Sequence, residues 1–289
     1  MNLPVDEHPG NHIAGAKLGS HVVLLGCGRM GSAMLAGWLN HPENFLKISV
    51  IEPAELDKKY TESDVIAHYS SLDDLANIDA TPIDFVVLAV KPQMMAEAVS
   101  QFRNMALDKI VFLSIAAGLS CEWISEQLGG NSQVVRAMPN TPAAVGAGIT
   151  ALYAAQSVAA DQKEFCVRLL QAIGGVIVLP DEKMMDAVTA LSGSGPAYVF
   201  LLTEAMQAAG EQLGLPQELS YKLARGTISG VGALLDQDTS DASVLRQNVT
   251  SKGGTTAAAL SVLMEDDALL KLISRAMSKA EERSRELGK

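Results

Sequence analysis

Short apolar runs alternate with amphipathic segments through the first 180 residues of the chain. The amphipathic segments 30–39, 92–106, 120–128 and 160–172 are typical of helices. Strands buried on both faces are continuous apolar runs, and their alternation with helices predicts an α/β fold. We expect a doubly wound, mainly parallel sheet with helices on both faces. The expected strands are 21–25, 47–51, 84–90, 109–114, 133–137, 148–153 and 175–179.

From residue 182 onward the strand-like runs disappear, and long segments rich in Ala, Leu, Met, Glu and Gln follow. Glycine and proline fall at the junctions of these segments, as in Gly195-Pro196 and Gly253-Gly254, where helices commonly begin or end. The pattern predicts a second, all-α domain. Its expected helices are 183–190, 196–213, 217–235, 241–247, 255–265 and 267–286.

The predicted helix 196–213 is apolar on more than one face. It carries the run 198–202 (YVFLL), and small or apolar residues continue at Ala205, Met206 and Ala209. A helix that is apolar nearly all round needs cover on every side, which a helical domain of about a hundred residues supplies poorly. We therefore expect a partner chain to cover this domain. Packing wholly against the first domain is the alternative.

Composition favours two folded domains over a disordered chain. Of 289 residues, 48% are hydrophobic and 19% charged, which supports large buried cores. The 33 acidic side chains exceed the 22 lysines and arginines, and the net charge of −11 disfavours nucleic acid as a partner. Aromatic residues make up only 4%, too few for base-stacking platforms. Any anionic ligand must therefore be bound by a local arrangement of groups.

Cysteine and histidine positions limit the chemistry further. Cys27, Cys121 and Cys166 lie far apart without a CxxC pair, which indicates reduced thiols and neither a disulfide framework nor a metal site. No histidine lies beyond His68, which excludes a histidine base from the last three quarters of the chain. No apolar run approaches the roughly 18 residues of a membrane span. Residues 1–20 lack the pattern of a signal peptide, so we expect a cytoplasmic protein.

A glycine motif stands directly after the first predicted strand, where a helix is expected to begin. It reads Gly26-Cys27-Gly28-Arg29-Met30-Gly31. Gly26 allows a tight turn, Gly28 lets a diphosphate approach the main chain, and Gly31 lets the helix touch the strand. Free N–H groups and the positive end of the helix dipole then favour an anion. The motif predicts a dinucleotide site; a glycine-rich turn without a ligand is the alternative.

Glu52 ends the second predicted strand, 21 residues after Gly31. An acidic side chain at this place can accept hydrogen bonds from both adenosine ribose hydroxyls, which favours NAD, and it would repel the 2′-phosphate of NADP. Arg29, Lys58 or Lys59 would offset that repulsion, so both cofactors stay open. A solvated loop carboxylate is the alternative interpretation.

Two further loops follow predicted strands at the edge of the sheet where such ligands bind. Lys91-Pro92 follows the strand 84–90, and we expect the lysine to contact the cofactor; a lysine at a helix start is the alternative. The segment 138–142 (MPNTP) follows the strand 133–137, and its two prolines stiffen the loop. This loop would adjoin the nicotinamide or serve only as a structural turn.

A second glycine-containing turn, 249–256 (VTSKGGTT), precedes an Ala-rich predicted helix. Its two glycines expose consecutive backbone N–H groups at the helix start, with hydroxyls beside them, which suits a carboxylate-sized anion. This is the local arrangement that an anionic ligand needs in an acidic chain. A simple N-cap by Ser or Thr is the alternative. The segment 192–198 (SGSGPAY) is consistent with either a helix start or a ligand contact.

Taken together, these motifs resemble those of the pyrroline-5-carboxylate reductase family. The resemblance runs from about residue 21 to the C-terminus and is carried, in order, by VVLLGCGRMGSAML, LAVKPQ, SIAAGLS, RAMPNTPA, LSGSGPAYVF and VTSKGGTTAAAL. It implies a Rossmann-type dinucleotide-binding domain at 21–180. It also implies an all-helical substrate-binding and dimerisation domain at 181–289, which interlocks with a second chain and in some members forms rings of dimers. Residues 1–20 lie outside the resemblance, and we expect a flexible extension there.

The resemblance implies an activity as well. NADPH or NADH would donate hydride to the ring imine of 1-pyrroline-5-carboxylate, giving L-proline in the last step of proline biosynthesis. Reducing an imine needs little acid–base machinery, which agrees with the distribution of histidine. The partners implied are a small-molecule substrate and a second copy of the chain, with neither nucleic acid nor membrane.

Residue by residue, the resemblance places the substrate on the second glycine turn. Thr256 would be the catalytic residue and would hydrogen-bond the imine nitrogen. The substrate would be bound by Ser251, Gly253, Gly254, Thr255 and Thr256. The cofactor would be bound by Leu25, Gly26, Cys27, Gly28, Arg29, Met30, Gly31, Glu52, Ala89, Val90, Lys91, Pro92, Ala116 and Asn248.

Two residues depart from the family pattern. Lys252 stands where many members have proline, which makes the turn less rigid or adds a cation that favours the carboxylate. Glu52 stands where members that prefer NADP have small or basic residues, so the common preference for NADPH is in doubt.

Two other functions remain as alternatives. A β-hydroxyacid dehydrogenase has a similar glycine loop, but it places a catalytic lysine in the first helix of its second domain. The corresponding segment here, 196–203 (PAYVFLLT), contains no lysine. A non-catalytic dinucleotide sensor is the second alternative, and the hydroxyl-rich turn at 249–256 disfavours it because a sensor would not need one.

Overall fold

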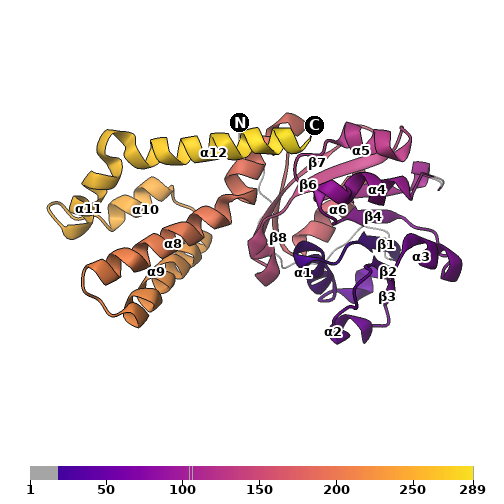
Figure 1. The fold of residues 1–289 in the computed structure, drawn as a ribbon, viewed down its shortest axis with the longest axis horizontal. Coiled ribbons are helices and arrows are strands. Elements are labelled where there is room, and N and C mark those ends of the chain that lie inside the picture. Colours follow the sequence, from indigo (N-terminus) through magenta and orange to yellow (C-terminus); the bar gives the residue numbers. More distant parts are fainter. Residues whose placement is uncertain (1–18, 104, 106, 289) are drawn as a thin grey trace. The chain divides into compact units, whose positions relative to one another are not determined.

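The computed structural model describes residues 19–103, 105 and 107–288 (Figure 1). They form two compact units, of which the first ends at Gly193 and also includes the chain from Glu281 onward, and the second is Ser194–Ala280. The expected flexible extension lies, up to residue 18, outside the described residues. The domain boundary near residue 180 stays a prediction.

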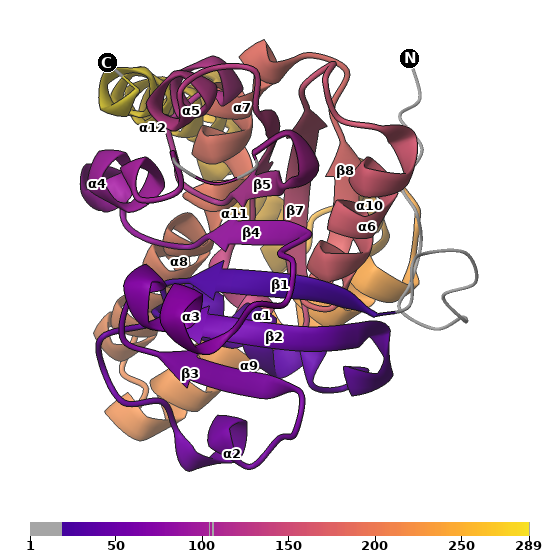
Figure 2. The same cartoon turned by 90° about the vertical axis from the view of Figure 1, so that its right-hand side faces the viewer.

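The first unit is built on an eight-stranded sheet with the strand order β3-β2-β1-β4-β5-β6-β7-β8 (Figure 2). β7 runs antiparallel to β6, and the other neighbours are parallel. This confirms the predicted mainly parallel sheet of Rossmann type. The strands are β1 (Ser20–Leu25), β2 (Phe45–Ile51), β3 (Ile66–Tyr69), β4 (Phe85–Leu88), β5 (Val111–Ser114), β6 (Gln133–Met138), β7 (Gly148–Ala154) and β8 (Gly174–Val178).

Helices cover both faces of this sheet, because successive strand residues point to opposite faces and both sets are apolar. On one face Leu24 and Val87 pack with α1 and α6, and on the other Leu25 and Leu88 pack with α3, α4 and α5. Trp38 closes the first core and donates its indole N–H to the Leu169 carbonyl (2.8 Å). The helices of this unit are α1 (Arg29–Trp38), α2 (Lys58–Thr61), α3 (Leu72–Ile78), α4 (Met95–Ser100), α5 (Cys121–Leu128), α6 (Ala160–Gln171) and α7 (Met185–Val188).

Two predicted elements need correction. The helix expected at 92–106 is a 3₁₀ turn (Pro92–Met94) followed by α4, which ends at Ser100. The chain turns there because Phe102 is fully buried, with its ring edge-on to Phe112 at 5.5 Å between centroids. The helix expected at 183–190 is a 3₁₀ turn, α7 and a π-helical turn (Thr189–Gly193), in which the Thr189 hydroxyl donates to the Met185 carbonyl at 2.8 Å.

The end of the last helix belongs to the first unit. The Ser284 hydroxyl donates to Asp186 Oδ1 (2.6 Å), and Arg285 Nε lies 3.9 Å from Asp186 Oδ2. Gly118 lets this helix approach, because a Cβ at Gly118 would lie 2.9 Å from Leu287 Cβ. Gly118, the glycine of the SIAAGLS motif, therefore allows α12 to pack closely against this loop.

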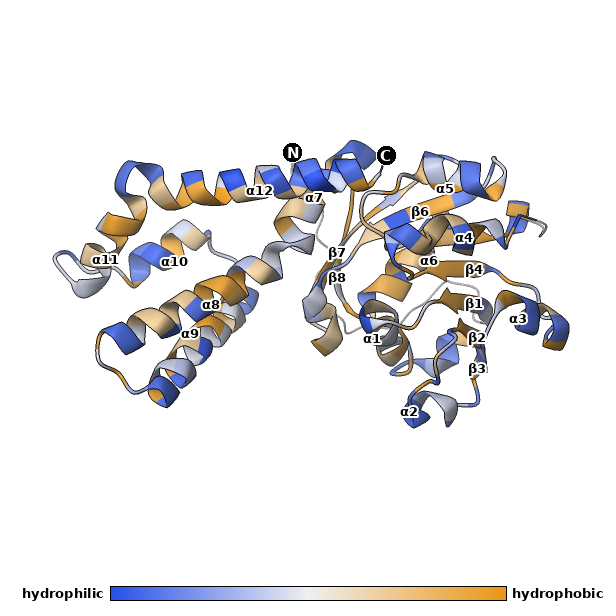
Figure 3. Ribbon diagram, viewed as in Figure 1, coloured by the Kyte–Doolittle hydropathy of each residue, from blue (hydrophilic) through white to orange (hydrophobic). Residues whose placement is uncertain are grey.

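The second unit consists of helices that bury almost nothing of their own. Of residues 194–280, all of which are described, only Ser220 and Ala224 are buried. Apolar turns of α8, α9 and α12 are visible along their lengths (Figure 3), and Phe200 and Leu201 are 63% and 65% exposed. The helices are α8 (Gly195–Gln212), α9 (Gln217–Gln237), α10 (Ala242–Asn248), α11 (Thr255–Met264) and α12 (Ala268–Leu287). None of the described helices is both long and apolar enough to cross a bilayer.

Candidate functional site

The loop after β1 is held in place by backbone contacts that only glycine permits. Gly26 has φ +92°, and its N–H donates to the Ile51 carbonyl (2.9 Å). A Cβ at Gly31 would lie 2.3 Å from the Gly26 carbonyl oxygen, closer than real Cβ contacts come. Helix α1 therefore starts directly against the end of β1, as the motif predicted.

The start of α1 is open to a ligand. Its N-cap is Gly28, whose backbone accepts the Ser32 N–H (2.8 Å), and no described side chain caps the first turn. Gly28 is exposed, and a Cβ placed on it would meet nothing within 4 Å. Space is therefore open beside Gly28, where the uncapped first-turn N–H groups favour an anion, which is the chemistry of a dinucleotide loop.

Glu52 lies against this same loop. Its Oε2 accepts the backbone N–H of Cys27 (2.8 Å), and its Oε1 accepts the N–H of Ala54 (3.3 Å). The contact shapes the local electrostatics, because burial and the nearby Glu52 carboxylate raise the pKa of the Cys27 thiol to about 11. Cys27 therefore stays a neutral thiol, and Glu52 does not have the isolated position of a solvated loop residue.

The remaining predicted cofactor residues of the first unit follow β4 and β5 at the same sheet edge. The register aligns Leu25 with Leu88 and Leu88 with Ser114, which places Ala89 to Pro92 and Ala116 beside the glycine loop. Lys91 is exposed, whereas Ala89 and Val90 are half-buried. Leu25 and Ala116 are 6% and 4% exposed, so they offer a ligand little besides their main chain.

Asn140, in the MPNTP loop, has a structural role that its sequence motif did not predict. This buried side chain accepts the Ile149 N–H through Oδ1 (3.0 Å) and donates through Nδ2 to the Ser192 hydroxyl (3.4 Å). It ties the loop after β6 to the segment before α8. Only the residue type hinted at this, since asparagine commonly bonds backbone groups in turns.

In the second unit, the predicted substrate turn joins α10 to α11. Gly253 has φ +75°, and a Cβ at Gly254 would lie 2.4 Å from Ser251 Oγ. The Gly254 N–H donates to the Ser251 carbonyl (3.0 Å), which closes the turn. Gly254 is the N-cap of α11, and no side chain caps it, so a hydroxyl N-cap does not account for the serine and threonines here.

The turn presents most of its polar groups to solvent. Ser251 and Thr255 are exposed, and Thr256 is half-buried. Asn248, the last residue of α10, is exposed as well. The uncapped N–H groups of α11 and three nearby hydroxyls can together bind a carboxylate and hydrogen-bond a neighbouring polar atom.

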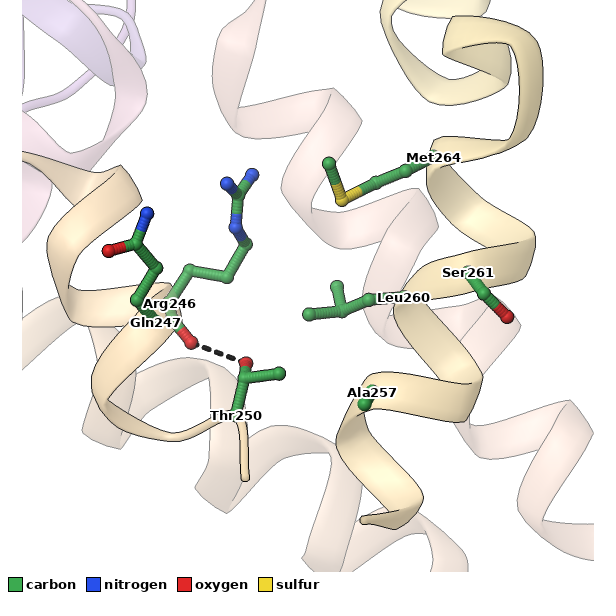
Figure 4. Close-up of a pocket in the computed structure, with 7 residues that line it drawn as sticks. All are labelled: Arg246, Gln247, Thr250, Ala257, Leu260, Ser261 and Met264. Carbon is green, nitrogen blue, oxygen red and sulfur yellow. Dashed lines mark hydrogen bonds between the residues drawn. The ribbon is translucent and has the colours of Figure 1, made fainter. Parts of the chain in front are cut away.

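A shallow pocket of about 420 Å³ opens beside the turn, between α10 and α11 (Figure 4). Leu260 and Met264 project from α11 toward α10, and the Thr250 hydroxyl donates to the Arg246 carbonyl (2.6 Å). No motif of the sequence indicated this pocket. Within the described residues, no group of three or more His, Cys, Asp and Glu side chains could hold a metal ion.

The predicted site residues thus form two groups, each within one unit. The glycine loop, Glu52 and the segments after β4 and β5 share one sheet edge, whereas Asn248 and the turn 251–256 belong to the helical unit. Ser192 of the SGSGPAY segment contacts Asn140, and Ser194 does not cap α8 with its side chain.

Comparison with known proteins gives two family matches. Residues 182–287 match the family model described as pyrroline-5-carboxylate reductase dimerisation, and residues 21–118 match the one described as NADP oxidoreductase coenzyme F420-dependent. The chain is 36% identical over 267 residues to the pyrroline-5-carboxylate reductase of Haemophilus influenzae, covering 92% of this chain and 97% of that protein.

Solved structures agree with these matches. A pyrroline-5-carboxylate reductase from Coxiella burnetii is 35% identical with a TM-score of 0.82, over 93% of this chain and 99% of that one. A pyrroline carboxylate reductase from Plasmodium falciparum, solved with NADP bound, is 29% identical with a TM-score of 0.78, over 95% of this chain and all of that one.

Proposed function

The chain belongs to the pyrroline-5-carboxylate reductase family, and we propose which of its residues carry the reaction. The protein is an oxidoreductase that reduces 1-pyrroline-5-carboxylate to L-proline with NADPH or NADH, the final step of proline biosynthesis. The observation that carries the assignment of residues is the pair of helix starts at α1 and α11. Each begins at a glycine and lacks a side-chain cap.

The first unit supplies the cofactor site. The N–H groups from Gly28 onward bind the diphosphate, and the open space at Gly28 supports this assignment. Lys91, exposed after β4, and the main chain of Ala89 and Val90 contact the nicotinamide side. A bound nicotinamide cofactor supplies the hydride.

The helical unit supplies the substrate site. The carboxylate of the substrate is bound by Ser251 and the N–H groups at the start of α11, and Lys252 adds a positive charge to the same turn. Thr256, half-buried in the first turn, hydrogen-bonds the ring nitrogen, and its hydroxyl oxygen accepts the N–H of the protonated imine. Hydride addition to the ring carbon of the protonated imine then leaves a neutral amine, so the protein needs positioning more than a strong acid or base.

A homodimer is part of the proposal. The second unit belongs to a dimerisation domain by its family match, and its apolar side chains are largely uncovered in one chain. We expect a mass of twice 30.5 kDa or a multiple of that dimer in solution, measured by light scattering. The three free cysteines suit a reducing compartment and the cytoplasm. The net charge of −11 disfavours a nucleic acid partner.

One assay tests the reaction and separates it from the alternatives. Purified protein is mixed with NADPH or NADH and 1-pyrroline-5-carboxylate, and the loss of absorbance of the reduced nicotinamide is followed. Consumption of both reactants supports the reductase. Cofactor binding without turnover would favour a sensor, and turnover only with β-hydroxyacids would favour that dehydrogenase class.

The role of Thr256 is tested by Thr256→Ala. We expect kcat to fall by roughly 10²-fold, the typical contribution of one side chain positioned at a reacting group, with unchanged affinity for the cofactor. The matched control is Ser261→Ala, which removes a hydroxyl that bonds the Ala258 carbonyl within the same helix (2.7 Å). An unchanged rate in Thr256→Ala would remove that residue from the mechanism.

A further inference from the structure

We propose that Glu52 makes this enzyme select NADH over NADPH. The inference rests on the proposed cofactor site and adds which of the two cofactors that site takes. It departs from the name of the matched N-terminal family and from the NADP-bound relative, both of which point to the phosphorylated cofactor.

Two backbone amides hold the Glu52 carboxylate, and one of them belongs to the glycine loop. Oε2 accepts the N–H of Cys27 at 2.8 Å, and Oε1 accepts the N–H of Ala54 at 3.3 Å. Its main chain is held as well, because its N–H donates to the Tyr69 carbonyl (3.0 Å) and its carbonyl accepts the His68 ring N–H (2.8 Å). A carboxylate bound in this way keeps one position relative to the loop.

This arrangement suits the two ribose hydroxyls of NADH. An ionised carboxylate has about four acceptor positions and no donor, and the two amides occupy about half of them. The remaining positions can accept hydrogen bonds from both the 2′- and the 3′-hydroxyl. Charge-assisted bonds of this kind are about twice as strong as neutral ones.

The same arrangement disfavours NADPH. A 2′-phosphate replaces a hydroxyl donor by a dianionic group without a hydrogen to donate, and it would face a fixed negative charge. Glu52 is able to move aside only by giving up the bonds from Cys27 and Ala54. Either outcome weakens the binding of NADPH relative to that of NADH.

The segment that contains Glu52 does not supply a net positive charge that would attract the 2′-phosphate. Residues 52–59 (EPAELDKK) carry three carboxylates against two lysines. Lys59 already interacts with other groups, since its Nζ lies 3.9 Å from Asp57 Oδ2 and 4.7 Å from the centre of the Tyr60 ring. The segment is therefore negative overall, and the carboxylate nearest the glycine loop is Glu52.

The test compares cofactor affinities in the full-length protein. NADH and NADPH are titrated separately against wild type, Glu52→Gln and Glu55→Gln, with nicotinamide fluorescence as the readout for Kd. Glu55→Gln is the matched control, because it removes the same charge from an exposed side chain three residues away. Initial rates with 1-pyrroline-5-carboxylate are measured on the same samples.

We expect wild type to bind NADH at least about tenfold more tightly than NADPH, which corresponds to about 1.4 kcal/mol. Glu52→Gln should bring the two Kd values within about threefold of each other, mainly by tightening NADPH. Glu55→Gln should keep the wild-type ratio. Wild type that binds NADPH as tightly as NADH overturns the proposal, as does Glu52→Gln with an unchanged ratio.

Failure of the selection is distinguishable from failure of the reaction. If imine reduction proceeds but NADPH is preferred, the reductase assignment stands and the role of Glu52 is wrong. If NADH binds selectively but the imine is not reduced, Glu52 has the proposed role and the assigned reaction is wrong.

Discussion

Adding one methyl group at two glycines of the same loop should have opposite consequences. At Gly31 the new Cβ would lie 2.3 Å from the Gly26 carbonyl oxygen, whereas at Gly28 it would meet nothing within 4 Å. We predict that Gly31→Ala impairs folding and that Gly28→Ala impairs only the binding of the cofactor.

The size of the Gly31 effect follows from the overlap. Since Cβ contacts below 3.0 Å essentially do not occur, α1 must move from β1 by about 0.7 Å, and the obstacle is backbone that cannot rotate away. Helix α1 buries Met34, Leu35 and Trp38, so the shift disturbs a packed core. Overpacking of this kind costs about 1–3 kcal/mol. For a unit of this size that lowers Tm by roughly 2–12 °C.

Gly28 has a different environment. Its φ of −67° is open to alanine, and the stability cost should not exceed about 1 kcal/mol, the difference between glycine and alanine as N-cap residues. The added methyl would occupy the space that we assign to the diphosphate. We therefore expect Kd for NADH to rise at least about tenfold while Tm of the cofactor-free protein stays close to wild type.

The assay combines thermal unfolding without cofactor and fluorescence titration with NADH on both variants and wild type. Each variant is the control for the other, because both add one methyl group to one loop. Wild-type affinity in Gly28→Ala would refute the assignment of this loop to the diphosphate. A wild-type Tm in Gly31→Ala would refute the steric basis of the glycine motif.

Three further predictions concern other residues. Desolvation lowers the pKa of buried His21, so the unfolded chain takes up a proton near pH 6.5 that the folded chain does not. The free energy of unfolding should therefore fall below pH 6.5 by at most about 1.4 kcal/mol per pH unit, and by less in His21→Asn. Thermal unfolding at pH 7.5 and 5.5 checks this. Asn140→Ala leaves the Ile149 N–H without its acceptor and should cost about 1–3 kcal/mol in unfolding experiments, whereas Asn140→Asp, which keeps an acceptor, should cost less. Lys252→Pro should raise KM for the imine acid severalfold with little change in kcat if the lysine attracts the carboxylate; an unchanged KM in steady-state kinetics would contradict that role.

The central strands were predictable because each is a continuous apolar run with cover on both faces, as in β1 and β4, where every residue is buried. β3 was missed for the opposite reason. It has only four residues at the sheet edge, and just one of them, Tyr69, is buried, so its sequence carries no strong apolar run. The length of α4 was overestimated because burial of Phe102, which ends the helix, depends on a partner ten residues later.

At the site, the glycines were predictable from local steric rules, and their positions relative to β1 agree with those rules. The contacts of Glu52 and Asn140 were not predictable from the sequence, because in each case a side chain bonds the backbone of a different strand or loop. Cys27 and Glu52 come together only once β1 and β2 pair in the register that aligns Leu25 with Ile51. Such contacts depend on tertiary structure, for which spacing along the chain gives no rule.

The acidity of the chain and its anionic ligands are reconciled by the use of main-chain donors. Backbone N–H groups carry no net charge, so the starts of α1 and α11 attract anions locally even though the protein has a charge of −11. The use of backbone N–H donors also explains how the Glu52 carboxylate can lie beside the proposed anion site. One amide of the loop, that of Cys27, donates to the carboxylate, and the amides from Gly28 onward remain for the diphosphate that we propose to bind there. On the proposed assignment, neighbouring amides of one loop bind the diphosphate and hold the carboxylate that discriminates at the ribose. One acidic residue would then change the cofactor preference without weakening the binding of the phosphates.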